Sequence, residues 1–350
     1  MVHRPSAPRR VLHVVDRVTG GVPVAVRSYV EHSPEGYRHV IASPFVRGVP
    51  APVWGDLPAV HLDWDTSSPL RAVRSLAHLR RWHPFDVVHA HSSFPGAYVR
   101  SMRWSPRIRV VYTPHCFAFS RTDVGALRRA AFRGIEAALA GRSAVAACGS
   151  GEKEQALSVG ARQKTTVVIP NLASLGDVDA DPGRREDVAE VLRVGMLGRW
   201  SAQKDPDYFT RRIQELRGAL PRTRVEATWI GDGPDDAPAG IRVTGWLSRE
   251  DVRANLQELD VYVHTAAWEG FPIALLDAHA VGLPILARPI PALPNLPAML
   301  SIDDGLARLS AALADRRFVE WSASNREAWS RYLGPRDVAA QRRALALAWG

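Results

Sequence analysis

The sequence predicts an α/β protein of two Rossmann-like domains that face each other across a cleft, and three observations lead to this prediction. Short apolar, β-rich runs alternate with longer stretches of helical periodicity, which is the pattern of a parallel sheet. The alternation stops between Asn171 and Glu190, where Asp, Gly, Pro and Ala dominate. It starts again at Leu192. Because ligands of open α/β sheets bind beyond the carboxyl ends of the strands, two such domains in tandem create a ligand site between them.

In the first half, runs rich in β-branched residues predict the strands, and the segments between them have helical spacing. The predicted strands are Val11–Val15, His39–Ala42, Val60–Leu62, Asp86–Ala90, Ile108–Thr113, Ala144–Ala147 and Thr166–Ile169. The predicted helices are Pro23–Glu31, Leu70–Arg81, Pro95–Met102, Val124–Ala140 and Glu152–Val159.

The second half repeats the pattern with clearer helix signals. Pro221 closes one helix, and Ser248 followed by Asp251 resembles the N-terminal cap of another. The predicted strands are Leu192–Leu197, Val225–Ile230, Arg242–Thr244, Val261–His264 and Pro284–Ala287. The predicted helices are Gln203–Leu220, one that starts after Ser248, Ile273–Val281, Arg317–Tyr332 and Pro335–Trp349.

These elements define the expected domains. We expect an N-terminal domain over 1–172, a linker over 173–190 and a C-terminal domain over 191–334. The last helix, within 335–350, is expected to pack back on the N-terminal domain.

Composition excludes several classes of protein. With 46% hydrophobic and 23% charged residues, the chain has the balance of a soluble globular protein. No apolar run reaches the ~20 residues of a membrane-spanning helix, and Met1 to Arg10 is basic without an apolar stretch behind it. Two cysteines, Cys116 and Cys148, cannot form a disulfide framework or a paired metal motif. The expected location is therefore the cytoplasm.

The net charge of +9 raises the question of nucleic-acid binding. The positive excess lies in the first half, and the basic residues are almost all arginine. This bias and the abundant alanine indicate genome composition rather than selection for phosphate contacts. We therefore expect no nucleic-acid partner.

A phosphate site is predicted where the strand Leu192–Leu197 runs into Gly198 and Arg199, with Lys204 at the predicted start of the next helix. Glycine lets a ligand approach the backbone, a helix N-terminus attracts anions, and the two cations can neutralise a diphosphate. The alternative is a pair of surface cations beside a turn.

A second group of residues follows later strands. Gly231-Asp232-Gly233-Pro234 comes after Val225–Ile230. Glu269 precedes a helix that carries Asp277 a little over two turns on, so both acids can lie along one face. Gly270 and the amides of Ile273 and Ala274 would extend the anion-binding helix end. The alternative is a capping glutamate and a solvated aspartate.

Taken in order, these motifs carry a family resemblance. Together with Thr244-Gly245-Trp246 and Glu269-Gly270-Phe271-Pro272, they resemble the C-terminal domain of retaining GT-B glycosyltransferases of family 4. The first half agrees through Gly20-Gly21, Asp86-Val87-Val88-His89-Ala90-His91, Thr113-Pro114-His115, Ser150-Gly151-Glu152-Lys153-Glu154 and Ile169-Pro170-Asn171. The resemblance covers nearly the whole chain and implies the GT-B fold. It also implies that 1–172 is the acceptor-side domain and that 191–334 is the nucleotide-sugar-binding domain.

The resemblance also implies roles for individual residues. Arg199 and Lys204 would hold the donor diphosphate, Glu269 would contact the transferred sugar, and Asp277 would bind the ribose hydroxyls. His115 would lie beside the donor sugar as a catalytic residue, unless it is a structural histidine. The further donor-binding residues would be Gly20, Gly21, Gly231, Gly233, Trp246, Leu247, Gly270, Phe271 and Ile273.

The implied activity is hexosyl transfer from a UDP-, GDP- or other nucleoside-diphosphate sugar, with retention and without a metal or other cofactor. The acceptor would be a sugar, a lipid-linked molecule or a small molecule, in polysaccharide, glycolipid or glycosylated-metabolite biosynthesis. An epimerase or hydrolase on the same fold, or an impaired nucleotide-sugar-binding protein, is the alternative.

Three departures from the family pattern concern the donor side. Asp277 stands where the family usually has glutamate, and the missing methylene is expected to weaken or lengthen the ribose contact. Arg288 to Pro294 stands where relatives commonly carry a Gly-Gly turn and an acidic residue, which puts the donor-side geometry there in doubt. Pro272 removes one backbone donor.

Two patterns suggest a metal. Asp63-Trp64-Asp65 matches the Asp-x-Asp motif of another glycosyltransferase fold, but no other nucleotide-site feature accompanies it, which favours an acidic loop. His89 and His91 point to one face of a strand. Without further ligands at a recognisable spacing, we expect them to line the acceptor side.

The segment Val124 to Arg142 predicts a basic amphipathic helix. Its apolar residues are Leu127, Phe132, Ile135 and Leu139, and its arginines are Arg128, Arg129, Arg133 and Arg142. Such a helix can lie on an anionic bilayer and so bring the enzyme to the inner membrane face. The alternative is that its apolar residues face the N-terminal core.

Overall fold

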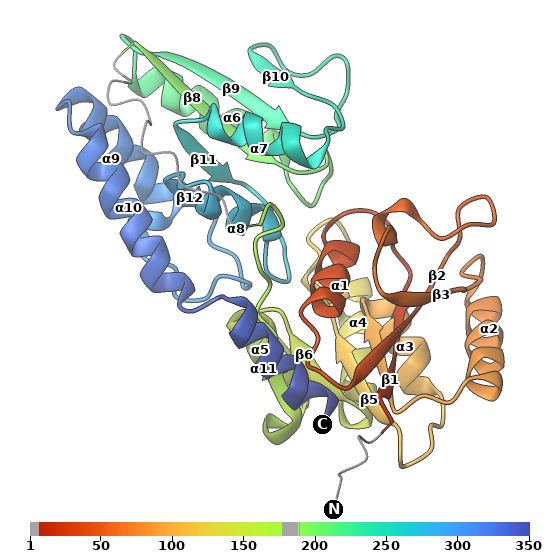
Figure 1. Cartoon of the computed structure of the whole chain (residues 1–350). Coiled ribbons are helices and arrows are strands. Elements are labelled where there is room, and N and C mark those ends of the chain that lie inside the picture. The colour runs from red at the N-terminus through yellow and green to blue at the C-terminus, as the bar shows by residue number, and fades with distance from the viewer. Residues whose placement is uncertain (1–6, 177–187, 189) are drawn as a thin grey trace, which may run out of the picture. The chain divides into compact units, whose positions relative to one another are not determined.

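The computed structural model describes residues 7–176, 188 and 190–350, and it divides into two compact units (Figure 1). One comprises Met1–Leu172 with Arg336–Gly350, and the other comprises Ala173–Pro335. We call them the N-terminal and the C-terminal unit. Both are built on parallel sheets, so the predicted α/β fold of two Rossmann-like domains is confirmed. Most of the predicted linker, 173–190, lies outside the described residues.

The described part of the N-terminal unit contains a seven-stranded parallel sheet in the order β3-β2-β1-β4-β5-β6-β7. Its strands are β1 (Arg9–Val15), β2 (Tyr37–Ser43), β3 (Ala59–Asp63), β4 (Val87–His91), β5 (Arg109–Thr113), β6 (Ala144–Ala147) and β7 (Thr166–Val168). Its helices are α1 (Gly21–Glu31), α2 (Pro69–Trp82), α3 (Ser93–Ser101), α4 (Ala126–Leu139), α5 (Ser150–Ser158) and α11 (Val338–Trp349). The strand order reverses between β1 and β4, which marks the switch point of this sheet.

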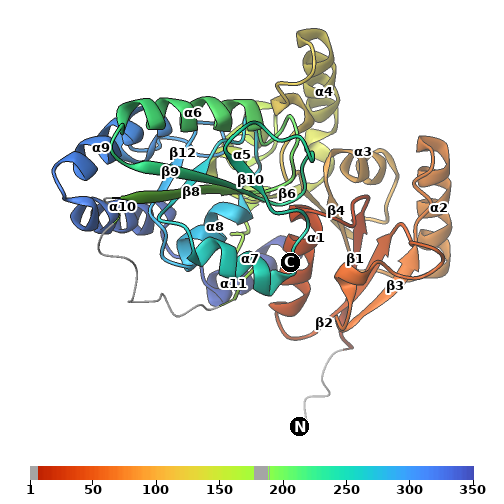
Figure 2. The ribbon, with the colours of Figure 1, turned by 90° about the horizontal axis from the view of Figure 1, so that it is seen from above.

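The described part of the C-terminal unit contains a five-stranded parallel sheet in the order β10-β9-β8-β11-β12. Its strands are β8 (Val191–Leu197), β9 (Arg224–Ile230), β10 (Ile241–Val243), β11 (Val261–His264) and β12 (Ile285–Ala287). Its helices are α6 (Pro206–Ala219), α7 (Arg249–Gln257), α8 (Ile273–Ala280), α9 (Ile302–Ala314) and α10 (Phe318–Leu333). Figure 2 shows α6 and α8 on opposite faces of this sheet. Its switch point lies between β8 and β11.

Burial on both faces explains the apolar runs of the strands. All five residues of β4 and all four of β11 are buried. The largest fully buried side chains include Trp54, Trp229 and Trp329. Each unit therefore has a core of its own, and the carboxyl ends of its strands are held rigidly.

Helix capping shows where the sequence analysis was right and wrong. Ser248 caps α7 as predicted and accepts a hydrogen bond from the amide of Asp251 at 3.1 Å. The helix predicted from Gln203 begins instead at Pro206, because Asp205 is its N-cap and accepts a hydrogen bond from the amide of Tyr208. Helix α9, capped by Ser301, was missed by the sequence analysis.

Helix α4 packs through a charged residue rather than through an apolar stripe. Glu136 is buried, ion-pairs with Arg100 at 2.8 Å and accepts a hydrogen bond from the Tyr112 hydroxyl at 2.9 Å. Leu127 is 87% exposed and Ile135 is 49% exposed. The alternative that the apolar residues of this helix all face the core is therefore wrong for these two.

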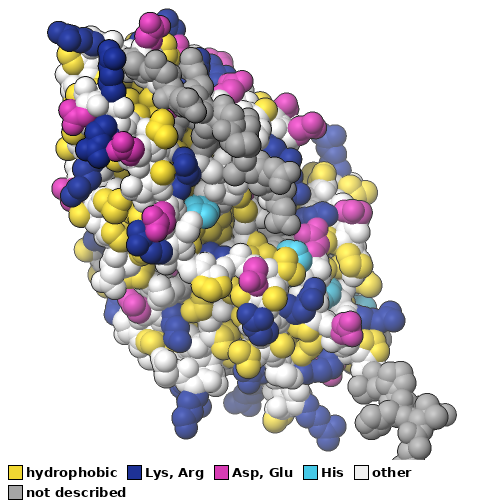
Figure 3. Space-filling model, turned by 60° about the vertical axis from the view of Figure 1, so that its left-hand side comes forward, with side chains coloured by type: hydrophobic (Ala, Val, Ile, Leu, Met, Phe, Trp, Pro, Cys, Tyr) yellow, Lys and Arg dark blue, Asp and Glu magenta, His cyan; other side chains and the backbone are white. Residues whose placement is uncertain are grey.

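Charges are mixed on the face of the molecule shown in Figure 3. Lys and Arg side chains alternate there with acidic and hydrophobic ones instead of forming one continuous patch. Within the described residues, no helix combines the length and the apolar character that crossing a membrane requires.

Candidate functional site

Lys204 and Glu269, both predicted to contact the donor, lie at the switch point of the C-terminal unit. Gly198 follows β8, and Glu269 lies in the loop after β11. These strands are neighbours, with Val261 of β11 opposite Val194 of β8. Since parallel strands end at one edge of the sheet, the two loops meet there.

Lys204 and Glu269 form an ion pair at this edge. Their side chains are only 16% and 11% exposed. Gln203 Nε2 donates to Glu269 Oε2 at 3.3 Å and to the carbonyl of Trp268 at 3.0 Å. The pair is therefore fixed by neighbours from both loops, and an incoming anion would compete with Glu269 for the ammonium group.

His264, the last residue of β11, was not predicted as a site residue. Its Nε2 lies 3.8 Å from Glu269 Oε1, and the side chain is fully buried. Burial, and then the charge of Lys204, hold its pKa well below the usual value, so the ring is neutral. The only sequence signal was a histidine at the end of an apolar strand.

Two glycines allow the loops to pass closely. Gly198 has φ +154°, and a Cβ there would lie 2.9 Å from Lys204 Cε. Gly231 has φ +138°, and a Cβ there would overlap the carbonyl group of Gly198. Any side chain at either position would displace the other loop or Lys204.

The segment with Trp246 and Leu247, which the resemblance assigns to donor binding, is joined to the Gly231 loop. The Gly231 amide donates to Thr244 Oγ1 at 3.0 Å, and Gly231 forms a bridge with Gly245. Trp246 is 68% exposed, and Leu247 is partly exposed. Gly233 packs closely against Val243 and Trp200, and Arg199 is half-buried.

The start of α8 supplies backbone donors beside Glu269. Pro272 is its N-cap residue and makes no side-chain cap hydrogen bond. The first amides of the helix, from Ile273 onward, have no partner within the helix and favour an anion. Gly270 and Phe271, just before it, are buried.

The altered loop after β12 is held by the start of α6. Arg288 ion-pairs with Asp205 at 2.6 Å, and its guanidinium lies 4.3 Å from the ring centre of Tyr208. The positive charge of Arg288 is therefore balanced by the residue that caps α6.

Asp277, expected to bind ribose, contacts the chain itself in this structure. Ser174 donates to its carboxylate through the amide and, at 2.8 Å, through Oγ, and the Leu175 amide donates at 3.2 Å. Asp277 is 3% exposed. Burial raises its pKa to about 6, although the hydrogen bonds from Ser174 and Leu175 oppose this shift. This contact joins residues far apart in the chain, so the sequence alone does not predict it.

In the N-terminal unit, Gly20 and Gly21 form the start of α1 at the carboxyl end of β1. Gly20 has φ +84° and is the N-cap residue, and Gly21 is exposed. The loop that carries them is at the β1–β4 switch point.

His89 and His91 do not line a surface in this structure. Both rings are fully buried. His89 Nε2 bonds Thr113 Oγ1 at 2.8 Å, and the Trp349 indole N–H donates to His89 Nδ1 at 3.2 Å. These two rings could therefore affect an acceptor only through the residues that they support, and not by contact with it.

His115 follows β5 in a strained turn. Its φ is +52°, and that of Cys116 is +102°. Glu152, which was noted only as part of a motif, accepts hydrogen bonds from the amides of Cys116 at 2.6 Å and Cys148 at 2.7 Å. Strain of this kind costs about 1–3 kcal/mol per residue and is found at functional sites.

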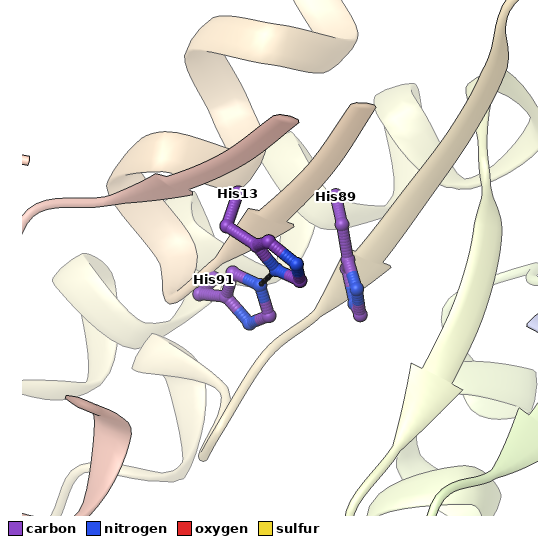
Figure 4. A group of neighbouring side chains, drawn as sticks. All are labelled: His13, His89 and His91. Carbon is purple, nitrogen blue, oxygen red and sulfur yellow. Dashed lines mark hydrogen bonds between the residues drawn. The ribbon is translucent and has the colours of Figure 1, made fainter. Parts of the chain in front are cut away.

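A group of ring nitrogens near this turn could hold a metal ion. One nitrogen from each of His13, His89 and His91 lies within 4.8 Å of the others (Figure 4). His13 was missed because its proximity depends on the pairing of β1 with β4, which places it opposite His89.

We predict a pH-dependent effect of Asp277 on stability. Since folding raises its pKa from about 3.8 to about 6, its contribution is present at low pH and is lost as pH rises through this range. The free energy of unfolding of the wild type, minus that of Asp277→Asn, should fall by about 3 kcal/mol between about pH 4 and pH 7. Chemical denaturation at several pH values measures this difference, and a difference independent of pH would contradict the assignment.

Comparison with known proteins places both units in one family. The model of glycosyl transferases group 1 matches residues 191–314, and that of the glycosyl transferase 4-like domain matches residues 9–172.

Relatives match over long stretches. The chain is 25% identical over 330 residues to an uncharacterised 41.2 kDa protein in the cps region of Klebsiella pneumoniae, covering 87% of this chain and 86% of that one. It is 25% identical over 243 residues to the Escherichia coli UDP-Gal:alpha-D-GlcNAc-diphosphoundecaprenol alpha-1,3-galactosyltransferase, covering 63% and 62%.

A solved structure shares the whole fold. Anabaena HepE in complex with UDP and glucose superposes with a TM-score of 0.69 at 16% identity, covering 97% of this chain and 98% of that one. Together with the two family matches, this shows that the chain belongs to the GT-B glycosyltransferases of family 4.

Proposed function

We propose that the protein transfers a hexose from a nucleoside-diphosphate sugar to an acceptor hydroxyl with retention of anomeric configuration. The observation that carries this proposal is the Lys204–Glu269 pair beside the N-terminus of α8. A cation, backbone donors and a carboxylate stand together at the switch point where α/β sheets bind ligands.

The chemistry of the transfer explains these groups. As the glycosidic bond to the diphosphate breaks, the anomeric carbon becomes oxocarbenium-like and negative charge collects on the leaving phosphate. Lys204, Arg199 and the α8 amides would stabilise that charge, most strongly where water is excluded. Glu269, released from Lys204, would then face the transferred sugar. These protein groups supply the positive charge, so we propose that no metal is needed.

The comparisons support the substrate classes. The E. coli relative is named for a UDP-Gal donor and a diphosphoundecaprenol acceptor, and HepE was crystallised with UDP and glucose. The Klebsiella relative comes from a cps region. We propose a UDP-sugar donor and a lipid-linked or saccharide acceptor in cell-surface polysaccharide or glycolipid synthesis, at the cytoplasmic face of the membrane.

We predict an α-linked product from an α-configured UDP-hexose. The protein is incubated with a panel of UDP- and GDP-sugars and a lipid-linked acceptor, with and without a chelator, and the anomeric proton of the product is read by NMR. A β-linked product would contradict retention. Release of free sugar alone, or an epimerised nucleotide sugar, would identify a hydrolase or an epimerase.

We predict that Arg199→Ala and Lys204→Ala each weaken donor binding, because each leaves diphosphate charge uncompensated. One lost charge-assisted hydrogen bond costs about 1.5–3 kcal/mol, which is a 10- to 100-fold rise in the dissociation constant. Calorimetry with UDP measures it. Arg222→Ala, an exposed arginine of the same unit, is the control and should bind as the wild type does. Unchanged affinity in both site variants would contradict the phosphate site.

Helix α4 offers a surface for the membrane. One face of this helix carries exposed apolar residues at helical spacing, namely Leu127, Ala131, Ile135 and Ala138. Arg128 and Arg142 are exposed beside them, while Glu136 and Leu139 face inward. An exposed apolar stripe with flanking arginines suits an anionic bilayer, where each basic residue contributes about 1 kcal/mol.

We therefore predict salt-sensitive binding to vesicles that contain phosphatidylglycerol, and little binding to phosphatidylcholine vesicles. Leu127→Glu with Ile135→Glu should abolish it, because the stripe becomes charged. Leu347→Glu changes an exposed leucine of α11 and should bind as the wild type does. Cosedimentation measures all three, and wild-type binding by the double variant would contradict a role of α4.

A further inference from the structure

Four histidines of the N-terminal unit are hydrogen-bonded head to tail. The bonds join His39 Nδ1 to His13 Nε2 at 3.1 Å, His13 Nδ1 to His91 Nε2 at 3.0 Å, and His91 Nδ1 to His115 Nε2 at 3.1 Å. The chain ends where His115 Nδ1 meets Cys148 Sγ at 3.3 Å. We call these four rings the histidine chain. It runs across β2, β1 and β4 to the strained turn after β5.

All four rings are neutral at physiological pH. Burial lowers the pKa of His39 to about 4 and that of His115 to about 3, and it holds those of His13 and His91 well below the usual value. A neutral imidazole carries one N–H and one lone pair. Each ring can therefore donate at one nitrogen and accept at the other, so all bonds of the chain must point the same way.

The end of the chain at His39 decides the direction. Among the described residues, His39 Nε2 has no hydrogen-bond partner, and the atom is buried. An unpaired buried N–H is rarer than an unpaired acceptor. His39 Nε2 therefore bears the lone pair, and every ring of the chain carries its proton on Nδ1. His115 donates to the sulfur of Cys148, whose pKa burial raises, so that it stays a thiol.

The neighbouring His89 has the opposite tautomer. The indole N–H of Trp349 can only donate, so His89 Nδ1 accepts and its Nε2 carries the proton toward Thr113. In this arrangement the lone pairs of His13, His89 and His91 are all engaged. A metal ion at the group in Figure 4 would have to displace these hydrogen bonds, and the inward carboxylate of Glu152 is already occupied by two amides.

We propose that His39, His13 and His91 are positioning residues that lock His115 as a neutral Nδ1–H tautomer over the strained His115–Cys116 turn. Both ring nitrogens of His115 are then engaged within the protein. His115 acts at the donor sugar through the position of its ring edge and backbone, and it does not accept a proton. This inference rests on the proposed function and on the place of His115 beside the donor sugar, which the family resemblance implies.

The first test is NMR of the full-length protein labelled with ¹⁵N-histidine, without substrate. Long-range ¹H–¹⁵N spectra distinguish the two neutral tautomers. We expect the Nδ1–H form for His13, His39, His91 and His115, the Nε2–H form for His89, and no protonation of these rings down to about pH 5.5. The opposite tautomer at His115, a charged ring in the chain, or one equivalent of bound metal in the same sample would overturn the proposal. This readout is independent of activity.

The second test interrupts the histidine chain at its last hydrogen bond before His115. His91→Phe keeps a ring but removes the N–H that His115 Nε2 accepts. The remaining groups that face His115 are then Tyr29 of α1, His89 of β4 and Cys148 after β6. One step further away, Glu152 of α5 holds the Cys116 amide and Arg336 lies near Cys148, while His13 of β1 contacts position 91.

We expect His91→Phe to lower kcat about 10- to 100-fold with little change in the KM for the donor. A displaced His115 ring slows the transfer step and leaves the binding of the donor unchanged. The NMR signal of His115 should lose its fixed tautomer, and kcat should gain a dependence on pH between about 5 and 7 as that ring becomes able to protonate. His61→Phe, on β3 outside the chain, is the control. Unchanged kcat, pH profile and His115 tautomer in a folded His91→Phe protein would overturn the positioning role.

Discussion

The carboxyl ends of β8 and β11 lie side by side because the order of the parallel sheet reverses between them, and the candidate site depends on this adjacency. It brings the loop with Gly198 and Lys204 against the loop with Glu269. This approach buries most of an ion pair. On the other side of β8, the loop after β9 passes so close to Gly198 that Gly231 has no room for a side chain. A partly buried pair gains from low dielectric only while both partners stay matched. An anion is therefore the group that can replace Glu269 as the partner of Lys204.

The two units use the same topology with different chemistry. At its switch point the C-terminal unit places charged groups and helix amides. At the β1–β4 switch point the N-terminal unit places neutral imidazoles, which satisfy one another by hydrogen bonds. Buried polar groups without partners cost about 1–3 kcal/mol each, so a continuous chain is a low-cost way to keep several histidines in a core. Its end is the His115–Cys116 turn, whose left-handed backbone needs the support that Glu152 also provides.

Much of the fold could be predicted from the sequence, because local signals determine it. Apolar runs such as Val261–His264 mark buried strands, and Ser248 followed by Asp251 marks a helix start. The beginning of α6 was misplaced because Lys204 and Asp205 are compatible with a helix, and only the cap geometry of Asp205 excludes it. The contacts of the site were harder to predict. Asp277 with Ser174, and His13 with His89 and His91, depend on strand order and long-range packing, which a single sequence does not express. The residue types of the donor site could be predicted, but the pairing of Lys204 with Glu269 could not.

The central claim is that the Lys204–Glu269 pair is the resting form of a diphosphate site. A crystal structure of the full-length protein with bound UDP tests it most directly. The account predicts the diphosphate against Lys204 Nζ and the first amides of α8, with the ammonium group turned from Glu269 to a phosphate oxygen. A diphosphate bound elsewhere, with Lys204 still paired to Glu269, would contradict it.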